Sequence, residues 1–303
     1  MLKSLLPNYS YRRLIARMAY NWLRGRDSLG HRLNRRNFDR FKQYRKAVLS
    51  CNVCGAVGEP FFDFPDLKLR RDHGIGELRE TMQCTTCGAT MRHRTLVHAF
   101  LKVASEKSGR MLSTVKQASE MGLGDLRILD TDAFSATSKM LRGLPGYVVS
   151  SFEPGKPLDT LIAPNHYNID LERIGFGDRS FDVVLTSDVM EHVRDIESAH
   201  REIARILKPG GCYVFTVPYD PGCPTHHVLV ETDGERNTYL VPPQYHGDPL
   251  TGGILAYRVF GRGIFGDLER RGLSADFRSI NDPAALISDG DVFVATKGGT
   301  ELA

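Results

Sequence analysis

The second half of the chain alternates strand-forming with helix-forming segments, and this alternation restricts the possible folds more than any other feature of the sequence. Short runs rich in β-branched and aromatic residues are expected to form strands, and the amphipathic runs between them are expected to form helices. The expected strands are 127–131, 147–152, 181–187, 212–217, 274–279 and 292–297, and the expected helices are 135–144, 196–207 and 260–271. This pattern predicts an α/β fold in which helices cover both faces of a mostly parallel sheet.

The helix expected at 196–207 has the clearest periodicity. Ile196, Ala199 and Ile203 fall on one stripe of such a helix, and polar residues occupy the other faces. The sequence Pro-Gly-Gly at 209–211 then ends the helix and turns the chain into the next strand.

Four cysteines form two close doublets, which read CNVCG at 51–55 and CTTCG at 84–88. Two residues between thiolates let one turn direct both sulfurs at a single ion, and the following glycine lets the backbone fold beneath it. We therefore predict a closed, structural Zn²⁺ site, with a hairpin or loop inserted in the 29-residue gap between the doublets. Surplus thiols or a redox pair are the alternatives. The predicted metal ligands are Cys51, Cys54, Cys84 and Cys87.

The cysteine pattern also bears on the compartment. Close doublets are typical of a metal site in a reducing compartment and not of a disulfide framework, and we interpret Cys212 and Cys223 as a strand residue and a loop residue. No apolar run approaches the roughly 20 residues that a membrane-spanning helix needs. A cytoplasmic protein without a transmembrane segment is therefore expected.

The net charge of +4 conceals a strongly basic N-terminal arm. Residues 1–50 contain 13 Lys and Arg against two acidic residues, so this stretch carries +11 and the remainder −7. We predict a basic helical arm over 1–48, a zinc-knuckle module over 49–94 and the larger α/β domain over 95–303. An amphipathic basic helix in the arm either packs on the rest of the protein or contacts RNA or an anionic membrane surface.

Residues 166–218 closely resemble the middle of class I S-adenosylmethionine-dependent methyltransferases, and a looser likeness extends over about 95–297. In that family an acidic residue follows the third strand, Phe-Asp opens the fourth, and Glu-His-Val begins the next helix. The corresponding residues are Asp170, Phe181-Asp182 and Glu191-His192-Val193. The resemblance implies a Rossmann-like seven-stranded sheet whose last strand is antiparallel, with S-adenosylmethionine over the carboxyl ends of the first strands.

Polar residues are expected to hold the adenosine at the strand ends. A carboxylate is expected to bind the ribose hydroxyls, and a second hydrogen-bonding group is expected to bind the adenine amine. Glu153 follows the second strand and Asp170 the third, so both stand where these groups are needed. Ser151 is an alternative contact for the ribose. Family members usually have Asp-x-Gly-x-Gly-x-Gly in the first loop, whereas residues 129–136 contain no glycine, although Ala133 and Ala136 are small. The predicted cofactor-binding residues are Asp130, Thr131, Asp132, Glu153, Asp170, Leu171, Ser187 and Asp188.

Methyl transfer is an in-line displacement on a sulfonium, so positioning of the acceptor contributes most of the catalysis. A hydroxyl acceptor also benefits from a base whose pKa lies near neutrality. His192 lies beside the predicted cofactor pocket, where a histidine can instead brace the helix start. The segment 218–258, rich in His, Tyr and Pro, is expected to form an acceptor pocket or lid. The predicted catalytic residues are His192, His246 and Tyr219.

The acceptor class is indicated by YHGDPLTGG at 245–253 and YRVFG at 257–261. These phrases resemble zinc-knuckle methyltransferases of bacterial glycan and surface-polysaccharide clusters, which implies O-methylation of a small-molecule or glycan acceptor; a purely structural loop is the alternative. An RNA methyltransferase is the second hypothesis, because zinc modules also precede the catalytic domain of ribosomal RNA guanine methyltransferases and a basic arm suits phosphates. A non-catalytic scaffold, motivated by the glycine-free loop, is the third.

Overall fold

The computed structural model describes residues 48–58, 60–63, 78–234, 236–246 and 253–299. The predicted basic arm lies almost wholly outside these residues, so its helix and its contacts with RNA or membrane stay predictions. Within the described part of the chain, no helix is both long enough and apolar enough to cross a bilayer.

The core of the molecule is a mixed eight-stranded sheet with the strand order β17-β18-β10-β9-β5-β6-β8-β7. Five neighbouring strands, from β10 to β8, run parallel. The strand β18 is antiparallel to both of its neighbours. The strands are β5 (Ile128–Asp130), β6 (Tyr147–Ser151), β7 (Thr160–Ala163), β8 (His166–Asn168), β9 (Phe181–Ser187), β10 (Leu207–Thr216), β17 (Leu273–Asp282) and β18 (Ile287–Lys297).

This sheet confirms the predicted fold class and adds one strand to it. The six strands expected from the sequence pattern are present, and the last of them is antiparallel. β8 supplies the seventh strand that the family resemblance implies, and β7 folds back antiparallel on β8 to form an additional edge. Asn165, in the turn between β7 and β8, adopts the left-handed backbone conformation with φ of 55°, which asparagine tolerates better than most residues.

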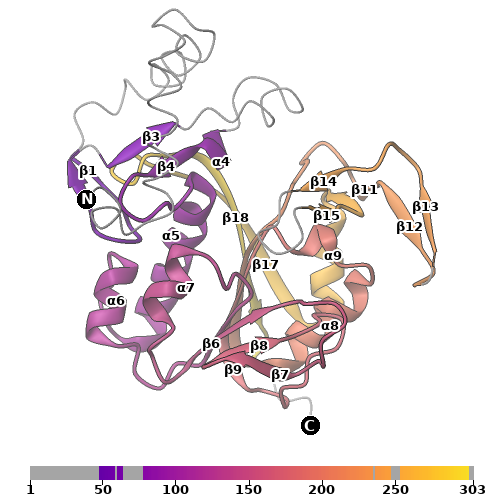
Figure 1. Cartoon of the computed structure of the whole chain (residues 1–303), viewed down its shortest axis with the longest axis horizontal. Coiled ribbons are helices and arrows are strands. Elements are labelled where there is room, and N and C mark those ends of the chain that lie inside the picture. Colours follow the sequence, from indigo (N-terminus) through magenta and orange to yellow (C-terminus); the bar gives the residue numbers. More distant parts are fainter. Residues whose placement is uncertain (1–47, 59, 64–77, 235, 247–252, 300–303) are drawn as a thin grey trace, which may run out of the picture.

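Helices cover both faces of the sheet, as Figure 1 shows. The two faces follow from strand geometry, because successive side chains point to opposite sides. Val183 and Val214 pack with Phe100 of a helix on one face, whereas Val184 and Phe215 belong to the hydrophobic cluster on the other. The first layer contains α5 (Met91–Ser108), α6 (Val115–Met121) and α7 (Ala136–Leu141), and the second contains α8 (Ile196–Ile206) and α9 (Gly263–Glu269).

The long helix α8 begins at Ile196, as the periodicity predicts, but the family pattern in which Glu-His-Val begins that helix is not followed. Glu191 and His192 lie in a single 3₁₀ turn, η2 (Met190–His192), and Val193 directly follows it. The long helix begins at Ile196 because the side chain of Asp195 accepts the backbone hydrogen bond of Ser198 at 3.0 Å and so caps its first turn.

The Pro-Gly-Gly sequence at 209–211 falls inside β10, not before it. The pairing of β10 with β9 shifts register between Leu207 and Cys212, so these residues form an irregularity of the strand. A Cβ on Gly211 would lie 2.8 Å from the carbonyl oxygen of Lys208. Glycine is therefore required at position 211 by this close approach of the backbone.

The N-terminal module is small and packs directly on the α/β body. It contains β1 (Leu49–Ser50), β2 (Val57–Gly58), β3 (Phe61–Asp63), α4 (Leu78–Thr81) and β4 (Met82–Cys84). β3 pairs antiparallel with β4 in the stretch where a hairpin or loop was predicted between the doublets. Val53 shares a hydrophobic cluster with Val115 of α6 and Ile287 of β18. Helix α5 crosses the domain boundary predicted near residue 95, and that boundary stays a prediction.

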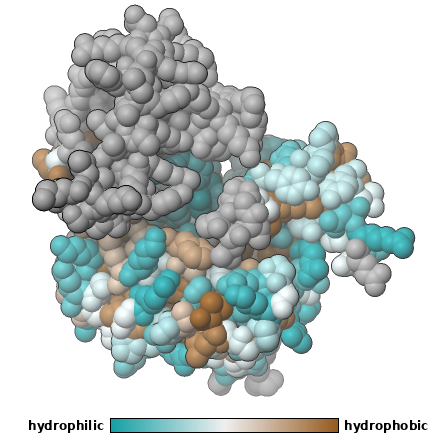
Figure 2. All heavy atoms as spheres, in the orientation of Figure 1, coloured by the Kyte–Doolittle hydropathy of each residue, from teal (hydrophilic) through white to brown (hydrophobic). Residues whose placement is uncertain are grey.

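The segment between β10 and α9 forms short ribbons that project from the sheet (Figure 1). Figure 2 shows mainly hydrophilic side chains on the visible side of this projection. The paired strands are β11 (His226–Val228) with β16 (Arg258–Phe260), β12 (Val230–Thr232) with β13 (Asn237–Tyr239), and β14 (Tyr245–His246) with β15 (Ile254–Leu255).

Candidate functional site

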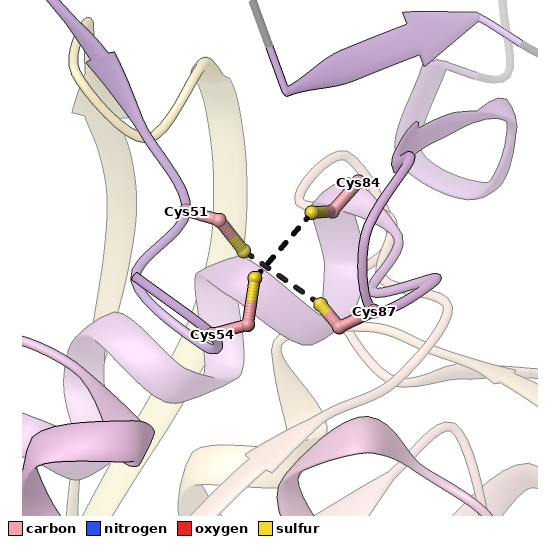
Figure 3. Close-up of side chains that lie close together, drawn as sticks. All are labelled: Cys51, Cys54, Cys84 and Cys87. Atoms are coloured by element: carbon pink, nitrogen blue, oxygen red, sulfur yellow. Dashed lines mark hydrogen bonds between the residues drawn. The ribbon is translucent and has the colours of Figure 1, made fainter. Parts of the chain in front are cut away.

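The four cysteines of the two doublets converge in space (Figure 3). The Sγ atoms of Cys51 and Cys87 lie 3.8 Å apart, those of Cys54 and Cys84 lie 3.7 Å apart, and all four lie within 4.8 Å of one another. Zn–S bonds of about 2.3 Å in a tetrahedron place the sulfurs about 3.8 Å apart. The thiol geometry therefore fits one zinc ion with no open position.

A buried arginine beside these thiols supports a negatively charged cluster. Arg94 is 0% exposed, and its guanidinium donates to the carbonyl oxygens of Ala89 and Ala285, each at 2.8 Å. Among the described residues no carboxylate is paired with it. Burial lowers the pKa of Arg94 to about 10, and the nearby cysteine thiols act against this shift. Four thiolates on Zn²⁺ carry a net charge of −2, which would compensate the buried cation.

The predicted cofactor residues lie at the carboxyl ends of four adjacent parallel strands. Asp130 is the last residue of β5 and Ser187 the last residue of β9. Glu153 follows β6 by two residues, and Asp170 follows β8 by two. Because β9, β5, β6 and β8 are neighbours, the sheet brings these polar groups to one edge, where open α/β sheets bind their ligands.

The glycine-free first loop is shaped by aspartates instead of glycines. The Asp130 carboxylate accepts the backbone N–H of Asp132 at 2.9 Å, and the Asp132 carboxylate accepts that of Phe134 at 3.2 Å. The Ser135 hydroxyl then caps α7 by accepting the N–H of Ser138. Such side-chain turns hold the backbone without requiring the conformational freedom of glycine.

The two aspartates of this loop differ in their ionisation. Burial raises the pKa of Asp130 to about 7, against the hydrogen bond that Tyr147 donates to it. Burial also opposes ionisation of Asp132. The hydrogen bond from His93 at 3.1 Å and the positive charges of His93 and Arg92 outweigh it and lower the pKa of Asp132. The loop therefore carries one carboxylate that is ionised at neutral pH and one that titrates there.

The second and third strand ends carry further polar contacts. The backbone N–H of Glu153 donates to Asn168 at 2.7 Å, and the Glu153 carboxylate lies 2.5 Å from Lys156. Asp170 accepts the backbone N–H of Glu172 at 2.9 Å, so its carboxylate shapes the turn that follows β8. Ser151, the alternative ribose contact, shares a 2.9 Å hydrogen bond with His166.

The N-terminal module brings four residues that the sequence did not single out to the carboxyl ends of the parallel strands. Arg79 of α4 binds both carboxylate oxygens of Asp188. Arg92 of α5 donates to the Ser187 hydroxyl at 2.5 Å and pairs with Glu80 at 2.6 Å. His93, which binds Asp132, is the fourth of these residues. The only sequence signal was the cluster of basic residues in MRHRT at 91–95, immediately after the second doublet.

This network holds Asp188 as an anion. Its side chain is 16% exposed, and the Thr216 hydroxyl also donates to it at 2.8 Å. Burial opposes ionisation, but the charges of Arg79 and Arg92 outweigh it and hold the pKa of Asp188 well below its usual range. The Asp188 carboxylate is thus already paired with residues of the N-terminal module.

Two of the three predicted catalytic residues meet beside a buried glutamate. The rings of His192 and His246 are perpendicular, with centroids 4.9 Å apart. His192 Nε2 lies 3.8 Å and His246 Nδ1 lies 3.6 Å from Glu191 Oε1. Glu191 itself is 0% exposed. His192 belongs to η2, directly after β9, and His246 is supplied by the ribbon of β14 and β15.

Comparisons with known proteins find a family match within the chain. Residues 154–215 match the family described as Methyltransferase domain. Protein YafE of Escherichia coli K12, named as uncharacterized, is 35% identical over 81 residues, which are 26% of this chain and 39% of that protein. Dimethylglycine N-methyltransferase of Parasynechococcus marenigrum is 38% identical over 52 residues, or 17% of this chain and 19% of that enzyme. The chain thus spans less than two thirds of these relatives.

Residues 154–215 are therefore part of a methyltransferase domain. The family match covers the segment on which the sequence resemblance was based, and the sheet has the strand arrangement that the resemblance implies. A crystal structure of an S-adenosylmethionine-dependent methyltransferase from Mesorhizobium loti aligns with 57% of this chain and 92% of that chain, at 17% identity and a TM-score of 0.37.

Within the methyltransferase domain, the strand ends offer polar groups that fit the cofactor. A narrow pocket between α5 and the ends of β5 and β9 is lined by His93, Asp130, Asp132 and Ser187, among others. Thr131 Oγ1 is buried in the same loop without a hydrogen-bond partner. Buried polar atoms are normally paired in complete structures, so an unpaired hydroxyl here is consistent with a ligand that supplies the partner.

Tyr219, the third predicted catalytic residue, and two other histidines of the segment 218–258 lie in other surroundings. Tyr219 follows β10 and packs on the rings of Phe277 and Phe293, and burial raises its pKa. His226 pairs with Asp267 at 2.7 Å, and His227 pairs with Asp220 at 2.7 Å. The structure therefore gathers His192 and His246 but places Tyr219 in an aromatic cluster.

Proposed function

We propose that this chain transfers a methyl group from S-adenosylmethionine to a hydroxyl of a small-molecule or glycan acceptor by in-line displacement. The observation that carries this proposal is the row of polar side chains at the carboxyl ends of β9, β5, β6 and β8, within a chain that matches the methyltransferase domain family. When bound, S-adenosylmethionine supplies an electrophilic methyl group on a sulfonium. The protein then contributes mainly by orienting acceptor and donor.

We assign the adenosine half of the cofactor to the second and third strand ends. Glu153 would bind the ribose hydroxyls and Asp170 the adenine amine, with Leu171 contributing an apolar contact. Charged acceptors make the stronger hydrogen bonds to hydroxyls and amines, and both carboxylates lie on the loops that open the sheet edge. The methionine half would lie over the loop of Asp130, Thr131 and Asp132, next to Ser187 and Asp188.

We place the acceptor beside His192 and His246. His192 lies in the 3₁₀ turn that follows β9, next to the proposed cofactor edge. The ribbon of β14 and β15 brings His246 beside it. A carboxylate and two imidazoles in one cluster favour loss of the acceptor's hydroxyl proton. The related dimethylglycine N-methyltransferase acts, by its name, on a small molecule, which supports a small acceptor.

We further propose that Cys51, Cys54, Cys84 and Cys87 hold a structural zinc ion, and that the protein works in the cytoplasm. The sulfur separations match a tetrahedral zinc site, as described above. All six cysteines of the chain are free thiols, which is consistent with a reducing compartment.

Calorimetric titration of the purified protein with S-adenosylmethionine tests the proposed activity at its first step. We expect micromolar binding, weakened about 10- to 100-fold by Glu153→Ala and by Asp170→Ala, since a hydrogen bond to a charged group contributes roughly 1.5–3 kcal/mol. Glu120→Ala is the matched control because Glu120 is an exposed residue of α6. Absence of binding by a folded protein would reject the enzyme and favour a non-catalytic scaffold.

RNA methylation is the second candidate, and the +11 charge of residues 1–50 is the observation that favours it. Binding through phosphates weakens steeply as the salt concentration rises. Titration of a labelled RNA at 50 and 200 mM salt tests this candidate. Tight binding that falls about 1,000-fold or more over this range would favour RNA over a small acceptor.

A further inference from the structure

Glu191 has a buried carboxyl group that makes no hydrogen bond in the described structure. Its side chain is 0% exposed, and neither of its two carboxylate oxygens has a hydrogen bond in the described structure. Two imidazole nitrogens lie 3.6 and 3.8 Å from Glu191 Oε1, which is too far for a hydrogen bond. An ionised carboxylate in such a position is strongly unfavourable unless a positive charge lies beside it.

The hydrogen bonding of His192 fixes which of its nitrogens faces this carboxylate. Nδ1 lies 2.9 Å from the backbone carbonyl of Leu255 and donates its hydrogen there. In the neutral ring, Nε2 then carries a lone pair and lies 3.8 Å from Glu191 Oε1. A lone pair this close to a carboxylate oxygen is repelled unless a proton or a metal cation lies between the two atoms. An N–H bond to a carbonyl on one side and a free nitrogen on the other is the arrangement typical of metal-binding histidines.

The three ligand atoms converge at distances suited to one ion. Glu191 Oε1, His192 Nε2 and one ring nitrogen of His246 lie within 4.8 Å of one another. The oxygen is 3.8 and 3.6 Å from the two nitrogens. A tetrahedral ion with bonds of about 2.1 Å separates its ligands by about 3.4 Å, so the two oxygen–nitrogen separations exceed that value by only a few tenths of an ångström.

We propose that Glu191, His192 and His246 bind one divalent transition-metal cation, separate from the four-cysteine site. Imidazole and carboxylate ligands suit Zn²⁺, Co²⁺ or Mn²⁺. Binding would supply a direct partner for the buried Glu191 oxygen, which has no hydrogen bond in the described structure. It would also give both imidazole lone pairs an acceptor.

The surrounding backbone holds these ligands in place. The carbonyl of Glu191 accepts the N–H of Tyr257 at 2.8 Å. The guanidinium of Arg258 donates to the carbonyls of Val193 at 2.5 Å and Arg194 at 2.8 Å, which secures the chain that follows η2. One ribbon supplies both His246 and the carbonyl that orients His192, because His246 pairs with Ile254, the neighbour of Leu255. Supporting hydrogen bonds of this kind tune metal affinity.

Three protein ligands leave a coordination position open, as in catalytic zinc sites. An acceptor hydroxyl in that position would lose its proton more readily, because a bound cation lowers the pKa of an oxygen ligand. This consequence rests on the proposed function. The cation site itself depends only on Glu191 and the two histidines.

The proposal is tested by titrating Co²⁺ into the full-length protein whose four-cysteine site already holds zinc, without cofactor or acceptor. Calorimetry should find one additional ion per chain. The visible spectrum should lack the intense charge-transfer bands of thiolate-bound cobalt. We expect Glu191→Gln and His246→Asn each to weaken Co²⁺ binding at least about 100-fold, because loss of a ligand costs at least as much as loss of a group that only supports one.

His227→Asn is the matched control, since this exposed histidine of the same segment pairs with Asp220 and should bind Co²⁺ like the wild type. Circular dichroism and retained zinc confirm that each variant is folded. A folded wild type that takes up no second ion, or a Glu191→Gln variant that binds it equally well, would overturn the proposal. Cobalt binding without S-adenosylmethionine binding would reject the proposed function and leave the cation site standing.

Discussion

Asp188→Asn is expected to destabilise the fold strongly, because this carboxylate joins the N-terminal module to the sheet. Its side chain is 16% exposed. Both of its oxygens accept from Arg79, and Thr216 adds a hydrogen bond at 2.8 Å. Removing one partner of a buried ion pair leaves the other charge uncompensated and typically costs about 3–5 kcal/mol. For a domain of this size that corresponds to a fall in Tm of roughly 6–20 °C.

The pH dependence of this loss identifies its cause. Asp188 has a folded-state pKa well below its usual range, so its contribution is fully present above the unfolded pKa of about 3.9 and disappears as the pH falls through the folded pKa. The difference in the free energy of unfolding between wild type and Asp188→Asn should therefore be constant from about pH 5 to 8 and become smaller below about pH 4.

Urea unfolding followed by circular dichroism measures this difference in the free energy of unfolding. Asp276→Asn is the control, because Asp276 pairs with Arg278 at 2.7 Å but is 62% exposed, and exposed pairs contribute at most about 1 kcal/mol. If Asp188→Asn cost no more than this control at pH 7, the buried ion pair would not join the module to the sheet in the way the structure implies.

Two further predictions concern the metal and the first loop. Removal of zinc by a chelator should lower the free energy of unfolding by several kcal/mol, since structural zinc contributes to folding directly; a metal-free protein with an unchanged unfolding curve would exclude a structural ion. Asp130, with a pKa raised to about 7, binds its proton more tightly when folded, so stability should fall between about pH 4 and 7. In Asp130→Asn, the free energy of unfolding should not show this fall with rising pH. If urea unfolding gave the same pH dependence for wild type and Asp130→Asn, the raised pKa of Asp130 would be refuted.

The sequence by itself predicted the features that local patterns encode. The strand expected at 181–187 is β9, and the helix expected at 196–207 is α8. These predictions succeeded because periodicity within a segment reports which of its faces is buried. The spacing within each cysteine doublet likewise identified four thiols that meet at one point. The expected role of Glu-His-Val was the exception: Glu191 and His192 lie in a 3₁₀ turn before the long helix, which an aspartate caps at its start.

Only the tertiary structure decided which side chains surround the strand ends. Arg79 reaches Asp188 across 109 residues of sequence, and Arg92 reaches Ser187 across 95. His246 reaches Glu191 from a separate ribbon. Such pairs leave no periodic trace in the sequence, because they depend on how α4, α5 and the ribbon of β14 and β15 pack against the sheet. Segment patterns thus determine the elements and their buried faces, whereas long-range packing determines the charges that meet at the site.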